Sequence, residues 1–193
     1  MTTTPRILAF SGSLRQESLN HTLVTLASKH AEALGAEARL IRLRDYPLPV
    51  YDGDIEAQGW PENLEPLKDH FRWADGFLIS TAEYNSSVTA ALKNAIDWVS
   101  RPSDPSEPRL VGFTGKTAGL LAASPSPLGG LRGLGHVRAI FQNIGTNVVP
   151  KQYALAKANE AFDEGGNLKD EKHVESVNAV VEMLVETTAK LNA

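Results

Sequence analysis

Apolar runs and helical periodicities alternate along the chain. Short apolar or alternating segments predict β-strands at residues 6–10, 38–43, 77–81, 116–123 and 148–149. Apolar residues that recur every three or four positions predict helices at residues 19–34, 64–74, 88–99, 131–144 and 168–191. A strand is followed by a helix five times over, and this order is typical of a parallel sheet with helices on both faces.

The number of strands narrows the fold class further. Five strands are expected to form an α/β three-layer sandwich with the flavodoxin-like strand order 2-1-3-4-5. No change of composition divides the chain, so residues 1–193 are expected to form one domain. The strand at 38–43 alternates apolar and basic residues and is expected at the sheet edge. The proline- and glycine-rich stretch 45–66 is interpreted as a long surface loop.

In a sheet with this strand order, ligands bind at the carboxyl ends of the first and third strands, where the order reverses. Loops 11–18 and 82–87 follow those two strands, and loop 124–130 follows the fourth strand. We therefore expect these three loops to form the functional site.

Composition and charge exclude several classes of function. The 193 residues contain 19 Lys+Arg and 23 Asp+Glu, and this balance does not favour binding to nucleic acid or to an anionic membrane. Cysteine is absent, which excludes disulfides, thiolate nucleophiles and cysteine-based metal sites, so any redox chemistry needs a bound cofactor. No apolar run reaches the length of a secretory signal core or a membrane span, and we expect a soluble cytoplasmic protein.

The first loop carries the residue types that bind an anion. The hydroxyls of Ser11, Ser13 and Ser18, the Arg15 guanidinium and the free N–H groups of a helix start predict a cradle for a phosphomonoester. The alternative is that Ser11, Ser18 and Asn20 are only turn and cap residues.

Other catalytic and phosphate-binding motifs are not met. A P-loop ending at Gly115-Lys116-Thr117 would need glycine in place of Leu110, and Arg138 occupies the third glycine position of a possible Rossmann fingerprint. The five histidines lack metal-ligand spacing, and no paired carboxylates suggest acid–base catalysis.

Three segments of the chain form a recognisable combination. They read Gly-Ser-Leu-Arg at residues 12–15, Glu-Tyr-Asn-Ser at 83–86 with Leu-Lys-Asn-Ala-Ile-Asp-Trp at 92–98, and Ser124 followed by a Gly-Gly pair at 129–130. In this order the segments resemble the NADPH-dependent FMN reductase family of flavodoxin-like flavoproteins, which includes chromate, quinone and azo-dye reductases. The resemblance covers roughly residues 6–150 and nearly every position of the three motifs.

The resemblance implies an FMN site and an activity. The implied cofactor-binding residues are Ser11, Ser13, Leu14, Arg15, Ser18 and Asn20 around the phosphate, and Glu83, Tyr84, Asn85, Ser86, Ser124, Gly129 and Gly130 around the isoalloxazine ring. NADPH or NADH would deliver hydride to FMN in a ping-pong reaction, and a quinone, flavin, azo compound or metal oxyanion would take the electrons. Neither a catalytic side chain nor a metal is implied, and relatives of this kind form homodimers or homotetramers.

Some positions and alternatives stay open. Ala82 stands where the family has proline, and a less pre-organised loop with weaker flavin binding is expected. Trp98 is interpreted as a packing residue or a subunit contact, and Arg101 as a contact to a subunit or to the pyridine nucleotide. Two other functions fit the same cradle, namely a flavodoxin-type electron carrier without its own turnover and a non-enzymatic flavin-binding module.

Overall fold

The computed structural model describes residues 3–192, and it contains one five-stranded parallel sheet in the order β2-β1-β3-β4-β5. The strands are β1 (Arg6–Ser11), β2 (Glu37–Arg42), β3 (Gly76–Ser80), β4 (Thr117–Ala123) and β5 (Asn147–Leu155). The helices are α1 (Leu19–Ala33), the 3-10 turn η1 (Leu43–Asp45), α2 (Gly53–Gln58), α3 (Leu64–Trp73), α4 (Ala90–Val99), α5 (Leu131–Asn143), α6 (Ala158–Ala161) and α7 (Glu171–Leu191). The predicted α/β class and strand order are confirmed.

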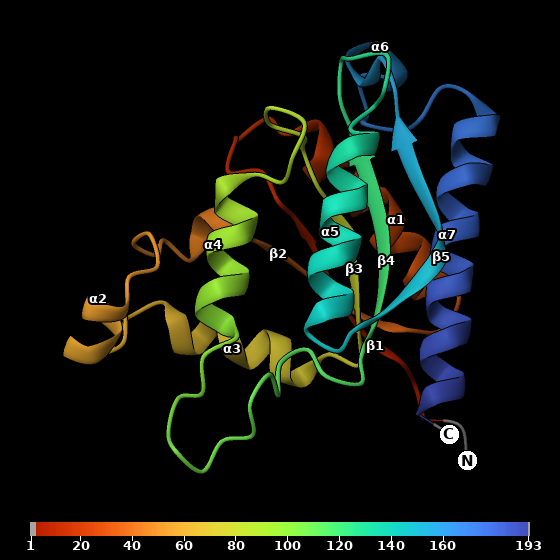
Figure 1. Cartoon of the computed structure of the whole chain (residues 1–193). Coiled ribbons are helices and arrows are strands. Elements are labelled where there is room, and N and C mark those ends of the chain that lie inside the picture. Colours follow the sequence, from red (N-terminus) through yellow and green to blue (C-terminus); the bar gives the residue numbers. More distant parts are fainter. Residues whose placement is uncertain (1–2, 193) are drawn as a thin grey trace.

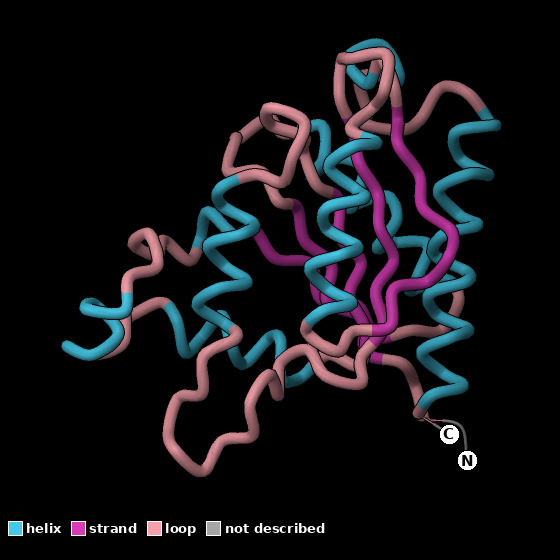
Figure 2. Tube along the Cα trace, viewed as in Figure 1, coloured by secondary structure: helices cyan, strands magenta, loops and turns pink. Residues whose placement is uncertain are grey.

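The sheet is the middle of three layers (Figure 2). Helices α1 and α7 cover one face with an aliphatic core, in which Leu23 and Leu184 are fully buried. Helices α3, α4 and α5 cover the other face with a core that is rich in phenylalanine, including Phe71, Phe77 and Phe141. The strands are buried on both sides, which explains why they appear in the sequence as short continuous apolar runs.

Several element bounds differ from the sequence predictions. Strand β5 extends over nine residues instead of the predicted two. Among residues 3–192 it pairs with β4 alone, so its middle is half-exposed and carries polar residues and Pro150, which hide the strand from an apolar pattern. Helix α2 was not predicted, since none of its residues is buried and it has no apolar stripe; the stretch 45–66 is therefore not all loop. The short helix α6 was also missed.

Capping side chains set the start of two helices. Helix α4 begins at Ala90 rather than at Val88, because the Thr89 hydroxyl accepts a hydrogen bond from the Leu92 N–H at 3.1 Å. Helix α7 begins at Glu171 rather than at residue 168, because the Asp170 carboxylate caps its first turn. Among residues 3–192, none of the helices combines the length and hydrophobicity that crossing a bilayer requires.

Trp98 is a packing residue. Its side chain is fully buried, and its indole N–H donates to the Pro49 carbonyl at 2.8 Å. The edge of the Tyr51 ring packs against it, with ring centroids 5.0 Å apart. The alternative that Trp98 lines a subunit contact is therefore wrong.

A buried ionic network attaches the loop after α4 to α3. The Lys68 ammonium donates to Glu107 Oε2 at 2.9 Å, and Arg72 Nη2 lies 2.6 Å from Glu107 Oε1. Burial alone would raise the pKa of the Glu107 carboxyl, but Lys68, the Ser103 amide and Arg72 outweigh it and lower the pKa to about 2. The carboxylate therefore stabilises the folded state only while it is ionised.

This network makes a prediction for acid stability. The folded-state pKa of Glu107 lies below its ordinary value of 4.5, so its contribution is complete above that pH and is lost as the pH falls toward 2. Glu107→Gln is expected to cost about 2 kcal/mol of unfolding free energy at pH 6, after allowance for solvent screening, and much less near pH 2. Urea unfolding of both proteins at a series of pH values measures this. Glu164→Gln, at an exposed position, is the control, and an equal cost of Glu107→Gln at both pH values would refute the assignment.

Candidate functional site

The first loop folds back on itself through serine side chains. Ser11 Oγ accepts a hydrogen bond from the Ser13 N–H at 3.1 Å, and Ser13 Oγ accepts one from the Arg15 N–H at 3.3 Å. Gly12 lies so close to its neighbours that a Cβ at this position would be 3.0 Å from Thr81 Oγ1. The loop backbone is thereby held against the end of β3, while the Arg15 side chain is exposed.

Ser18 and Asn20 fix the start of α1. Ser18 Oγ accepts the His21 N–H at 3.2 Å and caps the helix. Asn20 is buried; its Nδ2 donates to the Ala123 carbonyl, and its Oδ1 accepts from the Ser80 hydroxyl and the Ala123 N–H. These bonds match the turn-and-cap alternative for Ser11, Ser18 and Asn20. The alternative is compatible with anion binding, because a hydroxyl that accepts a backbone N–H still has its own hydrogen to donate.

The second loop is a two-residue hairpin. Tyr84 and Ser87 exchange backbone hydrogen bonds of 3.0 and 3.1 Å. Asn85 and Ser86 both adopt the left-handed conformation, with φ of 51° and 66°, as a type I′ turn requires. Within residues 3–192, the N–H groups of Asn85 and Ser86 have no backbone acceptor. The tip of the loop therefore offers two donors, and the strained φ of Ser86 is of a kind that is found at binding sites.

The third loop approaches the end of β5 closely. Gly129 and Gly130 have φ of 61° and 94°, and a Cβ at Gly129 would be 2.7 Å from the backbone of Leu155 and Ala156. Ser124 Oγ accepts the Ser126 N–H at 3.2 Å and closes the start of the loop. No side chain other than hydrogen fits at residue 129.

Glu83 joins the second loop to the helix that follows the third. Helix α5 starts after Gly130, which has no side chain to cap it. Glu83 Oε2 accepts the N–H groups of Arg132 and Gly133 at 2.9 and 3.1 Å, and its Oε1 accepts from Arg132 Nε at 2.9 Å. The Glu83 carboxylate is 8% exposed. The side chain of Glu83 thus caps α5, so loops 82–87 and 124–130 are held together.

Two residues of this construction were not singled out from the sequence. Thr89 caps α4 and also donates to the Gly12 carbonyl, which links the first loop to that helix. Its position three residues before the apolar Leu92 is a capping signal that could have identified it. Arg132 had no such signal, because its partner Glu83 lies 49 residues away in the sequence.

The three loops lie at the same edge of the sheet, after the ends of β1, β3 and β4 (Figure 1). They surround a cavity of about 120 Å³. Among the predicted site residues, those that line it are Ser13, Arg15, Ser18, Asn20, Glu83, Tyr84 and Ser124. Leu14 lines the adjoining hollow, while Ser11, Asn85, Ser86, Gly129 and Gly130 shape the loops and line neither cavity.

The donors of this cavity fit a phosphate group. Ser13 and Ser18 contribute hydroxyls, the first turn of α1 points its N–H groups toward the loop, and Arg15 contributes a positive charge. Among residues 3–192, no carboxylate forms an ion pair with Arg15. A dianionic phosphomonoester such as that of FMN would supply the missing negative charge.

Comparisons with known proteins identify the family. A family model described as NADPH-dependent FMN reductase matches residues 5–160. An NAD(P)H-dependent FMN reductase of Pseudomonas aeruginosa is 35% identical over 181 residues, which are 93% of this chain and 92% of that protein. A quinone reductase of Escherichia coli is 36% identical over 148 residues, or 76% of this chain and 74% of that protein.

A solved structure agrees with this family. The flavoenzyme FerB of Paracoccus denitrificans, an NAD(P)H:(acceptor) oxidoreductase, superimposes with a TM-score of 0.83 at 29% identity, over 98% of this chain and 100% of that one. Three loops surround one cavity at the sheet edge where the strand order reverses, and the relatives and the structural neighbour are named as reductases or as a flavoenzyme oxidoreductase. The chain belongs to the NADPH-dependent FMN reductase family and is a flavin-dependent oxidoreductase that uses FMN with NAD(P)H.

Proposed function

We propose that the three loops hold FMN with its phosphate in the first loop and its ring between the second and third. The residues proposed at the phosphate are Ser11, Ser13, Leu14, Arg15, Ser18 and Asn20, and those at the ring are Glu83, Tyr84, Asn85, Ser86, Ser124, Gly129 and Gly130. The observation that carries the proposal is the convergence of loops from β1, β3 and β4 on one cavity beside Arg15, which forms no ion pair within residues 3–192.

The residues have different tasks in this proposal. Ser13, Ser18 and Arg15 bind the phosphate directly, while Ser11 and Asn20 hold the loop in shape through their internal hydrogen bonds. In this proposal the ring extends beyond the cavity to the tip of the second loop, where the free N–H groups of Asn85 and Ser86 would meet its polar edge and favour negative charge. When bound, FMN would supply the redox chemistry, taking a hydride from NAD(P)H and delivering a hydride equivalent to the acceptor; reduction of a quinone to a hydroquinone takes one further proton from water. No side chain of the chain need act as an acid or base.

The proposed acceptor is a small quinone, in a ping-pong reaction in which NAD(P)⁺ leaves before the acceptor binds. Relatives that are named quinone reductases support this choice over an azo compound or a metal oxyanion. Tyr84 is 48% exposed beside the cavity, so the site is open to a second reactant.

Anaerobic mixing of the FMN-loaded protein with NADPH or NADH tests the proposal. We expect loss of the oxidised flavin absorbance within the mixing experiment, and its return when a quinone is added. Steady-state rates with both substrates varied should give parallel double-reciprocal plots. Reduction by neither nucleotide would favour an electron carrier or a flavin-binding module, and intersecting plots would contradict the ping-pong order.

We also propose that the chain forms one domain and assembles as a homodimer or homotetramer in the cytoplasm. Apolar side chains that a monomer would leave in water support the assembly, among them Val50 at 81% and Leu131 at 48% exposure. Sedimentation should give a particle larger than the 20.9 kDa chain, and denaturation should give one cooperative transition.

A further inference from the structure

A groove continues along α4 from the cavity that the three loops surround, which we call the FMN cavity. The FMN cavity shares Arg15 and Tyr84 with a second hollow of about 390 Å³. This second hollow shares Leu14 and Ala91 with a third, of about 350 Å³, which η1 and the segment that follows it close on the far side. We call the second and third hollows together the α4 groove. The groove is lined mainly by the first loop, by η1 with the segment after it, and by α4, and its lining residues include Leu14, Arg15, Arg44, Tyr46, Ala91 and Asn94.

The walls of the α4 groove are mainly apolar, and a guanidinium lies at each end. Arg15 belongs to the end next to the FMN cavity, and Arg44 belongs to the hollow that is farther from it. Neither guanidinium has an ion pair or a side-chain hydrogen bond within the described part of the chain. Arg6 pairs with Asp75 and Arg132 with Glu83, whereas the exposed Arg109, like Arg15 and Arg44, forms no ion pair among residues 3–192. In the proposed FMN-loaded protein the FMN phosphate pairs with Arg15, so the groove is an apolar trough with one available cation, Arg44, at its far end. Such a trough is suited to an elongated ligand that carries negative charge at that end.

The far wall of the groove is held in place without a ligand. Asn94 Oδ1 accepts the Tyr51 N–H at 2.7 Å, and Asn94 Nδ2 donates to the Pro49 carbonyl at 2.8 Å. The Tyr46 hydroxyl lies 2.7 Å from His70 Nε2 on α3. These bonds attach the segment after η1 to both α3 and α4, so binding in the groove requires little ordering of the protein.

We propose that the α4 groove binds the adenosine half of NAD(P)H and that Arg44 contacts one of its phosphates. The proposal rests on the proposed function, because a nucleotide whose nicotinamide lies at the FMN must extend its other half away from the flavin cavity. Leu14 and Ala91 provide apolar surface for the adenine, and Arg44 neutralises phosphate charge. A neutral quinone is small and has no need of a cation at the far end.

The phosphate that meets Arg44 belongs either to the pyrophosphate, which NADH and NADPH share, or to the 2′-position, which only NADPH carries. A pyrophosphate contact makes Arg44 a general nucleotide-binding residue. A 2′-phosphate contact makes it a residue that selects NADPH over NADH.

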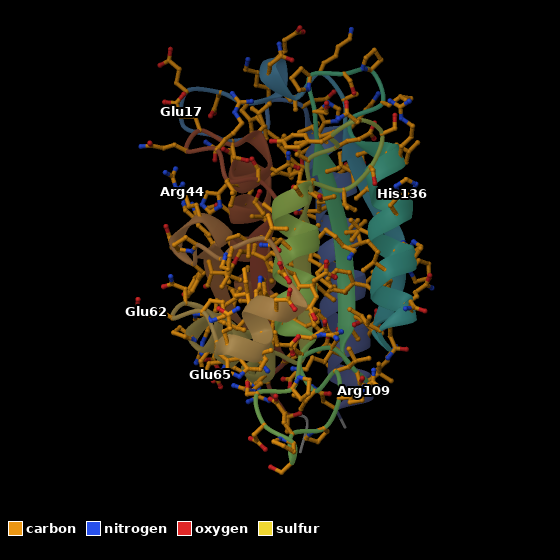
Figure 3. The ribbon with its side chains drawn as sticks, turned by 60° about the vertical axis from the view of Figure 1, so that its left-hand side comes forward. Glu17, Arg44, Glu62, Glu65, Arg109 and His136 are labelled. Atoms are coloured by element: carbon orange, nitrogen blue, oxygen red, sulfur yellow. The ribbon has the colours of Figure 1, made fainter. Side chains whose placement is uncertain are left out.

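Isothermal titration calorimetry of the FMN-loaded protein with the non-reducing nucleotides NADP⁺ and NAD⁺ tests the role of Arg44. Arg44→Ala is expected to weaken NADP⁺ binding about tenfold, as the loss of a charge-assisted contact does. The matched control is Arg109→Ala, since Arg109 is also exposed but lies far from Arg44, near the lower end of the view in Figure 3. It should bind both nucleotides as the unsubstituted protein does.

Comparison of NADP⁺ with NAD⁺ distinguishes the 2′-phosphate from the pyrophosphate as the partner of Arg44. A loss confined to NADP⁺ and 2′,5′-ADP assigns the 2′-phosphate, and an equal loss for NAD⁺ assigns the pyrophosphate. In turnover, the KM for the nucleotide should rise with little change in kcat. Unchanged binding of both nucleotides to Arg44→Ala, or a KM effect on the quinone alone, would overturn the proposal. If the unsubstituted holoprotein binds no NADP⁺ and NADPH does not reduce it, the proposed function fails instead.

Discussion

Glu83→Ala is expected to lower the free energy of unfolding by about 2 kcal/mol and to weaken FMN binding about tenfold or more. The variant leaves two N–H groups in the first turn of α5 without their acceptor and leaves Arg132 without its partner. Loops 82–87 and 124–130 are then no longer joined, so FMN must order them when it binds. Urea unfolding of the apoprotein and titration of FMN by quenching of its fluorescence measure the two effects.

Two further variants separate this role from a general charge effect. Glu186 pairs with Lys190 on the exposed side of α7, and Glu186→Ala should leave both stability and FMN binding unchanged. Glu83→Gln keeps an oxygen for the α5 amides but loses the ionic contact, so its effects should lie between those of the unsubstituted protein and Glu83→Ala. If Glu83→Ala behaves like Glu186→Ala in both measurements, Glu83 does not join the loops.

Among substitutions that add one methyl group to the site, Gly129→Ala is expected to cause the largest loss of stability and of FMN binding. Its Cβ would lie 2.7–2.8 Å from backbone atoms of residues 154–156, which belong to β5 and its end and can move only with the strand. The residue must also keep a φ of 61°, which costs a side chain about 1 kcal/mol. We expect the unfolding free energy to fall by about 3 kcal/mol, the Tm to fall by about 6–12 °C, and FMN to be retained poorly.

Gly35→Ala is the matched control for this variant. Gly35 has a φ of 88°, but apart from its chain neighbours no atom of residues 3–192 lies within 4 Å of the position that its Cβ would take. Gly35→Ala is therefore expected to lower the unfolding free energy by about 1 kcal/mol through the left-handed backbone conformation alone, and to leave FMN binding unchanged. Equal losses of stability in the two variants would show that contact with β5 contributes nothing.

The sequence predicts the layers of this fold because burial and periodicity coincide in most of its elements. Helix α3 carries a stripe of buried residues that includes Leu67 and Phe71, and β3 is buried along its whole length. The edge strand β5 and the exposed helix α2 lack such patterns. Strand β5 is held by backbone pairing with β4 and is partly exposed to solvent, and α2 buries no residue, so neither needs a continuous apolar face. Local propensity alone could not locate them.

The site could be predicted only as far as its loops. Strand order directs attention to the loops after β1, β3 and β4, and the residue types in the first loop indicate a phosphate. The tasks of individual side chains depend on distant partners. Asn20 reaches Ala123, Thr89 reaches the Gly12 carbonyl, and Glu83 reaches Arg132, and none of these pairs is close in sequence. Tertiary contacts therefore decide which polar residues bind the ligand and which support the loops.

Comparison of FMN with riboflavin tests the central claim most directly, because the two ligands differ only in the phosphate. The apoprotein should bind FMN at least about a hundredfold more tightly than riboflavin, since several charge-assisted contacts are lost without the phosphate. Ser13→Ala combined with Arg15→Ala should remove most of that preference while riboflavin binding stays the same. A double variant that still prefers FMN as strongly as the unsubstituted protein would contradict the phosphate cradle at residues 11–20.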